Sequence, residues 1–578
     1  MTLPIGLPFP YSVKRHGVSI TNCDNEPVNT PGCIQSHGML LVLHPAEFIV
    51  TQVSENCAQW TACGVDDVLG QPLAQIVGPT AARRIVELVA GGGLENNPTY
   101  ALAARLAGML ADAEPLDISV HVAGGALIVE LEPTGRELFG AVSERNYYAR
   151  VKTTMARLRA SPSLATFCQA IADEGRTTTG LDRVMVYRFQ ADESGEVVAD
   201  AHGPGLHSWF GLRFPASDIP KPAREIFKRL GVRPLPDARG SLCELVPLLD
   251  PASGAPLDMT YCALRAASVM YTEYLANMGV AATLTMPILR DGALWGLIIC
   301  HHYTPTRMSY QQRAAAEFIG QMASLEIDGA EVREHAQYQR RIDAVHHAVI
   351  AYAAMRSDVA ALMSAPGVSG QPGLLGGIEA GGVALVHRDQ WITLGRTPTL
   401  PHLQLLAAWV REQLGCDGSG RHLFVTNMLG SLFAPAMQCA EMASGVLVVT
   451  MPRSTQGDLL LWFRPEQKQV FNWSGNPYEN SALTGPLGTR LTPRRSFELW
   501  QEEVRGRALP WKQVEIDAAL TLRQWIADMV TCRDDQSDKT SVDAFRSSDE
   551  LDVLACVARP ELKEPLQDID PPTLHLKE

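Results

Sequence analysis

The sequence predicts a protein of several domains that combines helices and strands, an α+β protein. Three observations lead to this prediction. The chain has 578 residues, which is too long for one hydrophobic core and indicates roughly three or four domains. Hydrophobic residues make up 46% of the chain and charged residues 19%, as in ordinary folded proteins. Three successive stretches of sequence mix short apolar runs with helical patterns, and a long helical pattern precedes the third.

Composition also excludes several classes of partner. The net charge is −14 and no run of Lys and Arg appears, whereas a protein that binds a phosphate backbone needs a cationic face. No stretch approaches ~18 uninterrupted apolar residues, and the amino terminus lacks a charged segment followed by an apolar one. We therefore expect a cytoplasmic protein with neither a nucleic-acid partner nor a membrane partner.

The twelve cysteines do not predict a metal site. No C-x-x-C pair is present, so a structural zinc module is not expected and we predict no metal ligands. Scattered cysteines without a signal peptide are typical of a reduced, cytosolic chain. We expect Cys57, Cys168 and Cys439 to be small buried hydrophobic residues.

The first stretch predicts a small domain that ends near Pro133. After Gly38, strands are expected in the runs MLLVL, FIVTQVS, DISVHVA and ALIVELEP. Helices are expected at 65–76 and 81–89, and the loop GGGLENNP at 91–98 breaks the helical pattern.

The second stretch runs from about residue 147 to 305. Helices are expected at 151–160 and after Ser163, and strands in RVMVYRF, GEVVADA, ATLTMPIL and LWGLIICHH. These strands surround a long irregular region, 202–262. Irregular regions of this length are usually functional or disordered.

A long helix is expected to lead into the third stretch. Ser309 and Gln312 form an S-x-x-Q capping box, and helical spacing then continues towards Met355. Strands follow in VALVHRD, HLFVTN, GVLVVTMP and DLLLWFRP. A last helix is expected at 511–531, with one side made of Ile516, Leu520, Arg523, Ile526 and Val530.

Distant segments of the chain resemble the phytochrome photoreceptors, and bacteriophytochromes in particular. Residues 214–220 read FPASDIP, a signature of that family, although Asp-Ile-Pro alone is a weak signal because any solvated turn can contain it. Residues 23–38, CDNEPVNTPGCIQSHG, resemble the family's amino-terminal segment, and 493–497 match its PRxSF motif. The resemblance covers about residues 20–515.

The resemblance implies PAS, GAF and PHY domains, each an antiparallel sheet with flanking helices. It implies a figure-of-eight knot between PAS and GAF near Ile34, an exception to unknotted topology, and a hairpin "tongue" at about 470–510. The expected division is 1–133 for the amino-terminal segment and PAS domain, 134–308 for GAF, 309–355 for a linker helix, 356–515 for PHY, and 511–578 for an output helix with a short polar tail.

In this family a cysteine at the position of Cys23 carries biliverdin IXα, a linear tetrapyrrole, as a thioether. Plant relatives attach their pigment in the GAF domain, where this chain has Met270, and this favours biliverdin on Cys23. Without the surrounding motif, Cys23 would be an ordinary surface cysteine.

The family's pigment contacts are carried over residue by residue. Asp218, Ile219 and Pro220 would lie against the pyrrole rings, with Asp218 accepting from their protonated nitrogens. The alternative is that Asp218 is a helix N-cap, and both roles could hold at once. Arg233 and Arg265 match arginines that bind the propionates. The other expected contacts are Tyr187, Trp209, Phe214, Phe227, Ser268, Tyr271, Tyr274, Thr283, Thr285 and His301.

Three positions depart from the family pattern. Tyr271 stands where most phytochromes have a histidine, and Phe214 and Phe227 stand where tyrosines are common. The first departure removes a group that titrates near neutrality. We expect the pigment to be bound, but with a changed pH sensitivity of its spectrum.

In the tongue, Arg494 resembles an arginine that pairs with Asp218 in the resting state, and Ser496 a serine that replaces it after light. Trp473 and Trp500 resemble aromatic residues that change their packing as the hairpin refolds. Such a segment would be a bistable element biased by the pigment. An ordinary surface hairpin is the alternative.

The resemblance therefore implies a red/far-red photoreceptor that photoisomerises biliverdin and signals through its carboxy-terminal end, and a homodimer formed through helices. No enzyme is expected: after Pro510 there is one histidine and no glycine, so no ATP loop can be built. The chain either signals to an unknown protein partner or is a module of a longer one. The rival predictions are a ligand-binding PAS/GAF sensor without photochemistry, and a bilin-processing enzyme, for which no flavin or nicotinamide fingerprint appears.

Overall fold

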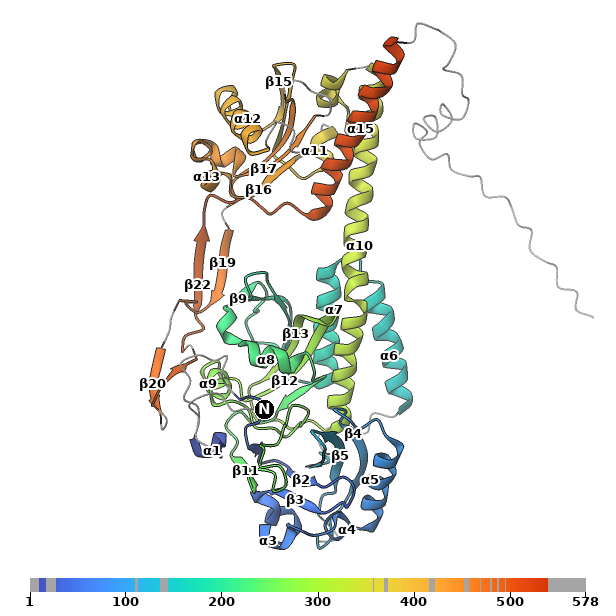
Figure 1. Ribbon diagram of the computed structural model, residues 1–578, viewed down its shortest axis with the longest axis vertical. Coiled ribbons are helices and arrows are strands. Elements are labelled where there is room, and N and C mark those ends of the chain that lie inside the picture. Colours follow the sequence, from blue (N-terminus) through green and yellow to red (C-terminus); the bar gives the residue numbers. More distant parts are fainter. Residues whose placement is uncertain are drawn as a thin grey trace, which may run out of the picture. The chain divides into compact units, whose positions relative to one another are not determined.

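The computed structural model describes residues 10–16, 27–109, 113–135, 144–356, 358–367, 373–414, 422–451, 457–467, 469–478, 481–485, 488–493 and 495–538. The chain forms two compact units (Figure 1). The first contains Met1–Arg341 and Glu466–Ala508, and the second contains Ile342–Pro465 and Leu509–Glu578.

The first unit begins with a seven-stranded antiparallel sheet in the order β1-β11-β3-β2-β6-β5-β4. Its strands are β1 Cys33–Gln35, β2 Met39–Leu43, β3 Val50–Ser54, β4 Thr99–Ala104, β5 Leu116–Ala123, β6 Ala126–Pro133 and β11 Leu242–Val246. The short helices near it are α1 Val13–His16, η2 Glu55–Cys57, α2 Ala58–Thr61, α3 Val65–Val68, α4 Leu73–Val77 and the longer α5 Pro79–Gly91.

Both faces of this sheet are buried at strand β2. Met39 and Leu41 pack into one core with the helices, whereas Leu40 and Val42 pack into another with Ile34 and residues of the region 243–264. Successive side chains of a strand point to opposite faces, so burial on both faces explains the unbroken run MLLVL.

Two expectations for this region were wrong. The helix expected at 65–76 is two short helices, because Gly70 adopts φ +75° and Pro72 is extended, so the chain turns between them. Strand β4 was not expected at all.

A second sheet in the first unit has eight strands in the order β10-β12-β13-β7-β8-β9-β19-β22. Its strands are β7 Arg183–Phe189, β8 Gly195–His202, β9 Leu212–Phe214, β10 Arg233–Leu235, β12 Ala282–Arg290, β13 Ala293–His302, β19 Gln469–Ser474 and β22 Leu499–Val504. The helices of this region are α6 Glu144–Arg159, α7 Leu164–Thr179, η3 Ala216–Asp218, α8 Lys221–Phe227, α9 Val269–Asn277 and α10 Tyr310–Arg356.

Helices α7 and α10 cover one face of this second sheet. Phe167 and Ile171 of α7 and Ile319 of α10 share a core with Val184 and Val186 of β7. The opposite face carries Tyr187 and its neighbours. The expected capping box at the start of α10 is confirmed: Ser309 N donates to Gln312 Oε1 over 3.0 Å, and Gln312 N donates to Ser309 Oγ over 3.3 Å.

The second unit has a five-stranded antiparallel sheet in the order β15-β14-β18-β17-β16. Its strands are β14 Gly382–His387, β15 Gln390–Gly395, β16 Leu423–Thr426, β17 Gly445–Thr450 and β18 Leu459–Arg464. Its helices are η4 Val359–Ser364, α11 Gly373–Gly377, α12 Leu400–Leu414, α13 Leu429–Leu432, η6 Ala434–Cys439, α14 Ala440–Ala443 and α15 Gln513–Asp538.

Helix α15 buries part of the expected side. Ile526 is buried in the core of the second unit and Ile516 packs against that core, together with Ala519 and Leu522, which were not expected, whereas Leu520 is 36% exposed. Val530 lies outside the described side chains. The expected stripe is therefore correct at Ile516 and Ile526 and wrong at Leu520.

Other expectations are confirmed, and one stays open. Cys57, Cys168 and Cys439 are buried. Strand β1 pairs with β11, with Ile34 opposite Cys243, and Ile34 also forms a bridge to Arg265. The knot expected at this place is a question of how the chain threads, and it stays a prediction.

Candidate functional site

The predicted site residues lie in the first unit. Cys23 and Arg494 fall outside the described residues. The others come from β7, β9, β10, β12 and β13, from the segments around α8 and α9, and from the hairpin formed by β19 and β22. The site is therefore built on the face of the second sheet that α7 and α10 leave free.

Four of the predicted aromatic residues gather on this face. The ring centroid of Phe214 lies 5.9 Å from that of Tyr187 and 6.1 Å from that of Trp209. The Trp209 ring meets His301 edge-on at 5.7 Å. Phe227, at the end of α8, packs against the same cluster. Strands β7, β9 and β13 thus bring distant residues into one apolar wall.

His301 is a buried, neutral imidazole. Burial lowers its pKa to about 3, and the charge of Arg183 acts in the same direction. Its Nδ1 atom is buried and has no hydrogen-bond partner among the described residues. The register of the sheet places His301 opposite Thr283, whose buried hydroxyl lies near the Tyr271 phenol. The Nδ1 atom of His301 is therefore available to a ligand on this face.

Asp218 is held by a tyrosine and is not an N-cap. The Tyr274 hydroxyl donates to Asp218 Oδ2 over 2.8 Å, and Pro220 occupies the N-cap of α8, so the N-cap alternative was wrong. Ile219 lies between Asp218 and Pro220 in the chain. Ser268 caps α9 by accepting from Met270 N over 3.1 Å, which fixes the helix that carries Tyr274.

The two predicted arginines are buried beside one another. Arg233 is 8% exposed and Arg265 is 4% exposed. Arg233 donates to the carbonyls of Ala263, Arg265 and Ala266 at 3.2, 2.6 and 3.3 Å, and Arg265 donates to the carbonyl of Thr260 at 3.1 Å. Burial lowers the pKa of Arg233 to about 10. Burial and the neighbouring Arg233 charge lower the pKa of Arg265 well below its ordinary value.

These arginines differ from the other buried cations of the described residues. Arg183 pairs with Asp200, Arg313 with Glu132 and Arg464 with Glu515. Within the same described ranges, neither Arg233 nor Arg265 forms an ion pair. Two neighbouring buried guanidinium groups without a paired carboxylate favour an anionic ligand.

Sequence reasoning missed two residues that hold this segment. Glu130 of β6 accepts from the backbone N–H groups of Ala263 and Leu264 at 3.1 and 2.8 Å, and burial raises its pKa to about 7. The Gln35 side chain donates to the carbonyls of Ala263 and Arg265 at 3.2 and 3.1 Å. The sequence did contain a signal for Glu130, because a glutamate inside the apolar run ALIVELEP indicates a buried carboxylate that needs a partner.

Tyr271 and the two threonines line the same region. Burial raises the pKa of Tyr271, and the nearby hydroxyls of Thr283 and Thr285 and the charge of Arg233 oppose that rise. Thr283 and Thr285 are two residues apart on β12 and so share a face. The sheet places Thr285 opposite Arg233 of β10. The phenol therefore stays neutral across the physiological range.

The hairpin expected as the tongue is added to the second sheet. Strand β19 pairs in parallel with β9, with Trp473 opposite Arg213, and antiparallel with β22, with Trp473 opposite Trp500. The shorter strands β20 Ser481–Gly485 and β21 Gly488–Thr492 extend the hairpin. Ser496 accepts from Glu498 N at 3.4 Å. Strand β9 ends at Phe214, so the hairpin is joined to the segment that leads to the site.

A side-chain contact connects the hairpin to the site directly. The Phe497 ring meets Tyr274 edge-on at 5.2 Å, and Tyr274 donates to Asp218. The Arg213 guanidinium lies 3.9 Å from the centroid of Phe471. Residues of the FPASDIP and PRxSF motifs thus share a neighbour in Tyr274.

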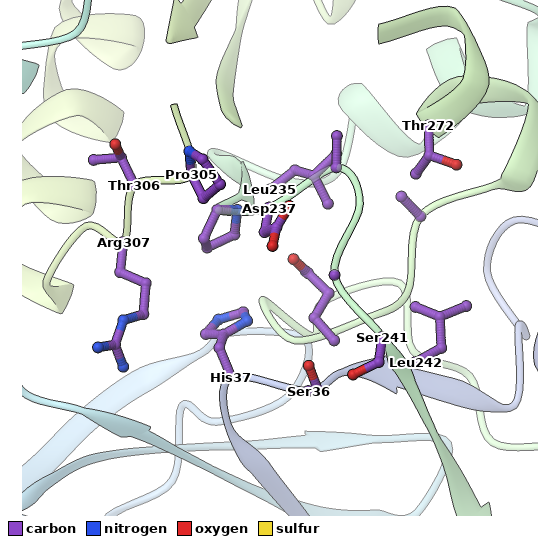
Figure 2. Close-up of a pocket in the computed structure, with 15 residues that line it drawn as sticks. Ser36, His37, Leu235, Asp237, Ser241, Leu242, Thr272, Pro305, Thr306 and Arg307 are labelled. Carbon is purple, nitrogen blue, oxygen red and sulfur yellow. The ribbon is translucent and has the colours of Figure 1, made fainter. Parts of the chain in front are cut away.

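A cavity of about 400 Å³ is also present in the first unit. Figure 2 shows its lining, which comes from the amino-terminal segment with His37, from residues 235–242, and from Pro305, Thr306 and Arg307. None of the predicted pigment contacts lines it. His37 Nε2 lies 3.3 Å from Glu132 Oε2 at this place. The cavity nevertheless adjoins the site, because Gln35, Ala267 and Thr272 also line it.

Among the described residues, no helix is both long and apolar enough to cross a bilayer.

Three sequence families match successive parts of the chain. Residues 23–134 match a PAS fold, residues 163–327 a GAF domain and residues 342–535 a Phytochrome region. Similar curated proteins include cyanobacterial phytochrome B from Nostoc, 33% identical over 96% of this chain and 72% of its own length. A bacteriophytochrome from Xanthomonas campestris is 30% identical over 93% of this chain and 82% of its own length.

Solved structures agree with these matches. A crystal structure of a bacteriophytochrome from the photosynthetic bacterium R. palustris superposes with a TM-score of 0.74 at 33% identity, covering 89% of this chain and 100% of that one. The photosensory core module of the Stigmatella aurantiaca phytochrome gives a TM-score of 0.69 at 34% identity, covering 89% of this chain and 99% of that one. The expected PAS, GAF and PHY domains are confirmed.

Proposed function

The chain belongs to the phytochrome family of photoreceptors, and from this premise we propose that it is a red/far-red light sensor that binds biliverdin IXα covalently through Cys23. Isomerisation of the pigment by light would change the hairpin, and the change would be passed to a protein partner. The proposal also includes the expected domain boundaries at residues 133, 308, 355 and 515. It includes a cytoplasmic location and a homodimer as well.

The pair of buried arginines carries the proposal. A buried guanidinium without a counter-charge is costly, and Arg233 and Arg265 are neighbours with neither in an ion pair among the described residues. The two propionates of biliverdin would supply two negative charges here. Ser268, Tyr271 and Thr285 would add hydroxyl contacts on the same side.

The rest of the site fits a flat, polar-edged pigment. Tyr187, Trp209 and Phe214 form an apolar wall, and His301 presents an Nδ1 atom that is unpaired among the described residues. Asp218, held by Tyr274, is suited to accept from a cationic pyrrole system. Ile219, Pro220 and Phe227 would complete the apolar surface. When bound, the pigment supplies a double bond that isomerises on absorbing light.

The hairpin is suited to report the state of the pigment. It contacts Tyr274 through Phe497 and continues the sheet beyond β9. In our proposal Arg494 pairs with Asp218 before illumination and Ser496 takes its place afterwards, while Trp473 and Trp500 repack. Two alternative packings of one segment are what a switch requires.

The first test is the absorption spectrum of the full chain with biliverdin in darkness, after red light and after far-red light. Reversible interconversion of two spectra would support the proposal. Zinc-enhanced fluorescence on a denaturing gel should mark the chain, should disappear in Cys23→Ala and should persist in Cys63→Ala, which changes an exposed cysteine. Pigment bound without photoconversion would favour a ligand-binding PAS/GAF sensor, and no pigment uptake would reject the proposal.

A further inference from the structure

A buried ion pair lies behind the aromatic wall of the site. Arg183 of β7 and Asp200 of β8 have side chains that are 1% and 0% exposed. Arg183 Nη1 donates to Asp200 Oδ2, and Arg183 Nη2 donates to the carbonyl of His207. In the sheet, Arg183 stands directly opposite His301 of β13. The pair is therefore next to the site without being one of its predicted contacts.

Both members of this pair hold Trp209. Asp200 Oδ2 accepts from the backbone N–H of Trp209 over 2.7 Å and from the Ser208 hydroxyl over 3.3 Å. The Arg183 guanidinium lies 4.5 Å from the centroid of the Trp209 ring, a distance that gives a cation–π attraction. One residue of the pair fixes the backbone of Trp209 and the other fixes its ring.

Stability does not account for this arrangement. Taking two charges out of water is expensive, and apolar residues of similar volume are often as stabilising as a buried ion pair. Arg183 Nε and Asp200 Oδ1 are also buried without a hydrogen-bond partner in the described ranges, which adds to the cost. The ion pair instead fixes the position of Trp209, and Trp209 in turn contacts His301 and Phe214.

We propose that Arg183 and Asp200 are positioning residues, which fix the orientation of Trp209 and through it the place of His301 against the pigment ring that moves. This inference rests on the proposed function and deepens it. Without the pair, the Trp209 ring would adopt several orientations, and a pigment in this pocket would be held in several geometries.

The test compares Arg183→Met with Arg183→Lys in the full chain assembled with biliverdin. Arg464→Met is the matched control, because Arg464 is a buried arginine paired with Glu515 and stacked 4.0 Å from the Trp511 centroid, in the other unit. We expect attachment to be unchanged in all three. In Arg183→Met the fraction converted by light should fall by about threefold or more, with a broadened absorption band, since small misplacements in a site have large effects.

Arg183→Lys keeps the charge but loses the planar group that stacks on Trp209 and bridges Asp200 to His207. We expect it to remain defective, and full rescue by lysine would overturn the positioning role. Asp200→Asn is the second variant if Arg183→Met does not fold. Spectra and photoconversion equal to those of the parent in these variants would also overturn the inference.

Hydrogen exchange of the pigment-free chain separates this inference from the proposed function. Residues 207–210 should exchange faster in Arg183→Met and at the parent rate in Arg464→Met. If the parent shows no photoconversion while this exchange difference appears, the proposed function fails and the positioning of Trp209 stands. If the parent photoconverts and exchange in 207–210 is unchanged, the inference fails alone.

Discussion

Gly195 shows how a residue with no side chain shapes the site. It begins β8 beneath the Tyr187 ring, and a Cβ atom added there would overlap that ring. The ring has little room to move, because Phe189 and Phe214 pack against it at 5.4 and 5.9 Å. We expect Gly195→Ala to reduce the free energy of unfolding by about 1–3 kcal/mol and to slow pigment uptake. Thermal unfolding and the rate of biliverdin assembly would measure both effects.

Gly91→Ala is the control for this variant. A Cβ atom at Gly91 meets nothing within 4 Å, and the residue ends a helix far from the site in sequence. Its unfolding and assembly should match the parent. If Gly195→Ala and Gly91→Ala have the same unfolding free energy and the same assembly rate, the Tyr187 ring has more room to move than the structure indicates.

Tyr271 is the departure with the clearest consequence for pH. Its pKa is raised by burial, so the phenol stays neutral from pH 5 to 9 and should not make the spectrum pH-dependent. In Tyr271→His the introduced imidazole titrates near or below its ordinary pKa of about 6.5, because burial and the Arg233 charge disfavour its cation. We expect absorbance of the bound pigment to titrate in that range in the variant only.

Tyr478→His provides the comparison, since Tyr478 is 69% exposed and lies in the hairpin. Its spectrum should be as independent of pH as that of the parent. A flat titration curve for Tyr271→His would refute the assignment of Tyr271 to the pigment site.

The sequence motifs named candidate site residues, but not the groups that these residues contact in the folded chain. Motifs indicated Arg233 and Arg265, yet only the folded chain shows that both donate to backbone carbonyls of 260–266. Glu130 was invisible as a site residue because it comes from another domain, more than one hundred residues earlier in the chain. Contacts between distant segments have no periodic signal in the sequence.

At the scale of elements, the short strand β9, which lies between β8 and β19 in the second sheet, decides how the hairpin is held. It is three residues long, and the stacking of Arg213 on Phe471 reinforces its pairing with β19. We expect Arg213→Ala to lose about 1 kcal/mol of local stability. Hydrogen exchange at 469–474, followed by mass spectrometry, should then be about fivefold faster.

The control is Arg290→Ala, which removes a half-exposed arginine paired with Asp328 at the end of β12. Exchange at 469–474 should not change in that variant. If both variants leave the hairpin unaffected, backbone pairing alone holds β19.

A second element-scale contact joins β6 to α10. Arg313 forms a buried two-pronged ion pair with Glu132, at 2.9 and 2.6 Å. Burial alone would raise the pKa of Glu132, but the Arg313 charge and the contact with His37 outweigh burial and lower it to about 2. The folded-state pKa is below the unfolded one, so this stabilisation is complete above pH 4.5 and is lost as the pH falls towards 2.

We expect Arg313→Met to lower the free energy of unfolding by about 3–5 kcal/mol at neutral pH, because it leaves a buried unpaired carboxylate. Denaturant unfolding of the parent and the variant would measure this, and the difference between them should narrow in acid as Glu132 becomes protonated. The double variant Arg313→Met with Glu132→Gln should recover much of the loss. A small effect of the single variant would show that Glu132 is solvated.

Helices and strands could be predicted where local sequence signals agreed with one another. They could not be predicted where contacts between distant segments determine the structure. The capping box at Ser309 located the start of α10, and the runs of β7 and β13 were read correctly from their apolar residues. Strand β15 was not expected, because its side chains are mostly half-buried or exposed and give a weak pattern. The side of α15 that faces the sheet was predicted only in part, because Ala519 and Leu522 contribute to it beside the expected Ile516 and Ile526.

At the scale of the whole molecule, three covalent connections join the units, one within α10 and one at each flank of the hairpin segment. Helix α10 passes from one unit to the other at Arg341 and Ile342, and the segment Glu466–Ala508 belongs to the first unit although both of its flanks belong to the second. A change at the site therefore has a direct route through the hairpin, because β9 both pairs with β19 and ends at Phe214.

This connectivity leads to a prediction for the illuminated chain. If the site and the hairpin are coupled through β9, a light-driven rearrangement around Asp218 and Tyr274 must alter the pairing of β19 with β9, since both depend on one short segment. We expect hydrogen exchange of the pigment-loaded chain to change after red light at 469–474 and 499–504, and to return after far-red light. Strands β5 and β6, which belong to the other sheet, should exchange at the same rate in both states. Photoconversion with no change at β19 and β22 would mean that the signal leaves the site by α10 alone.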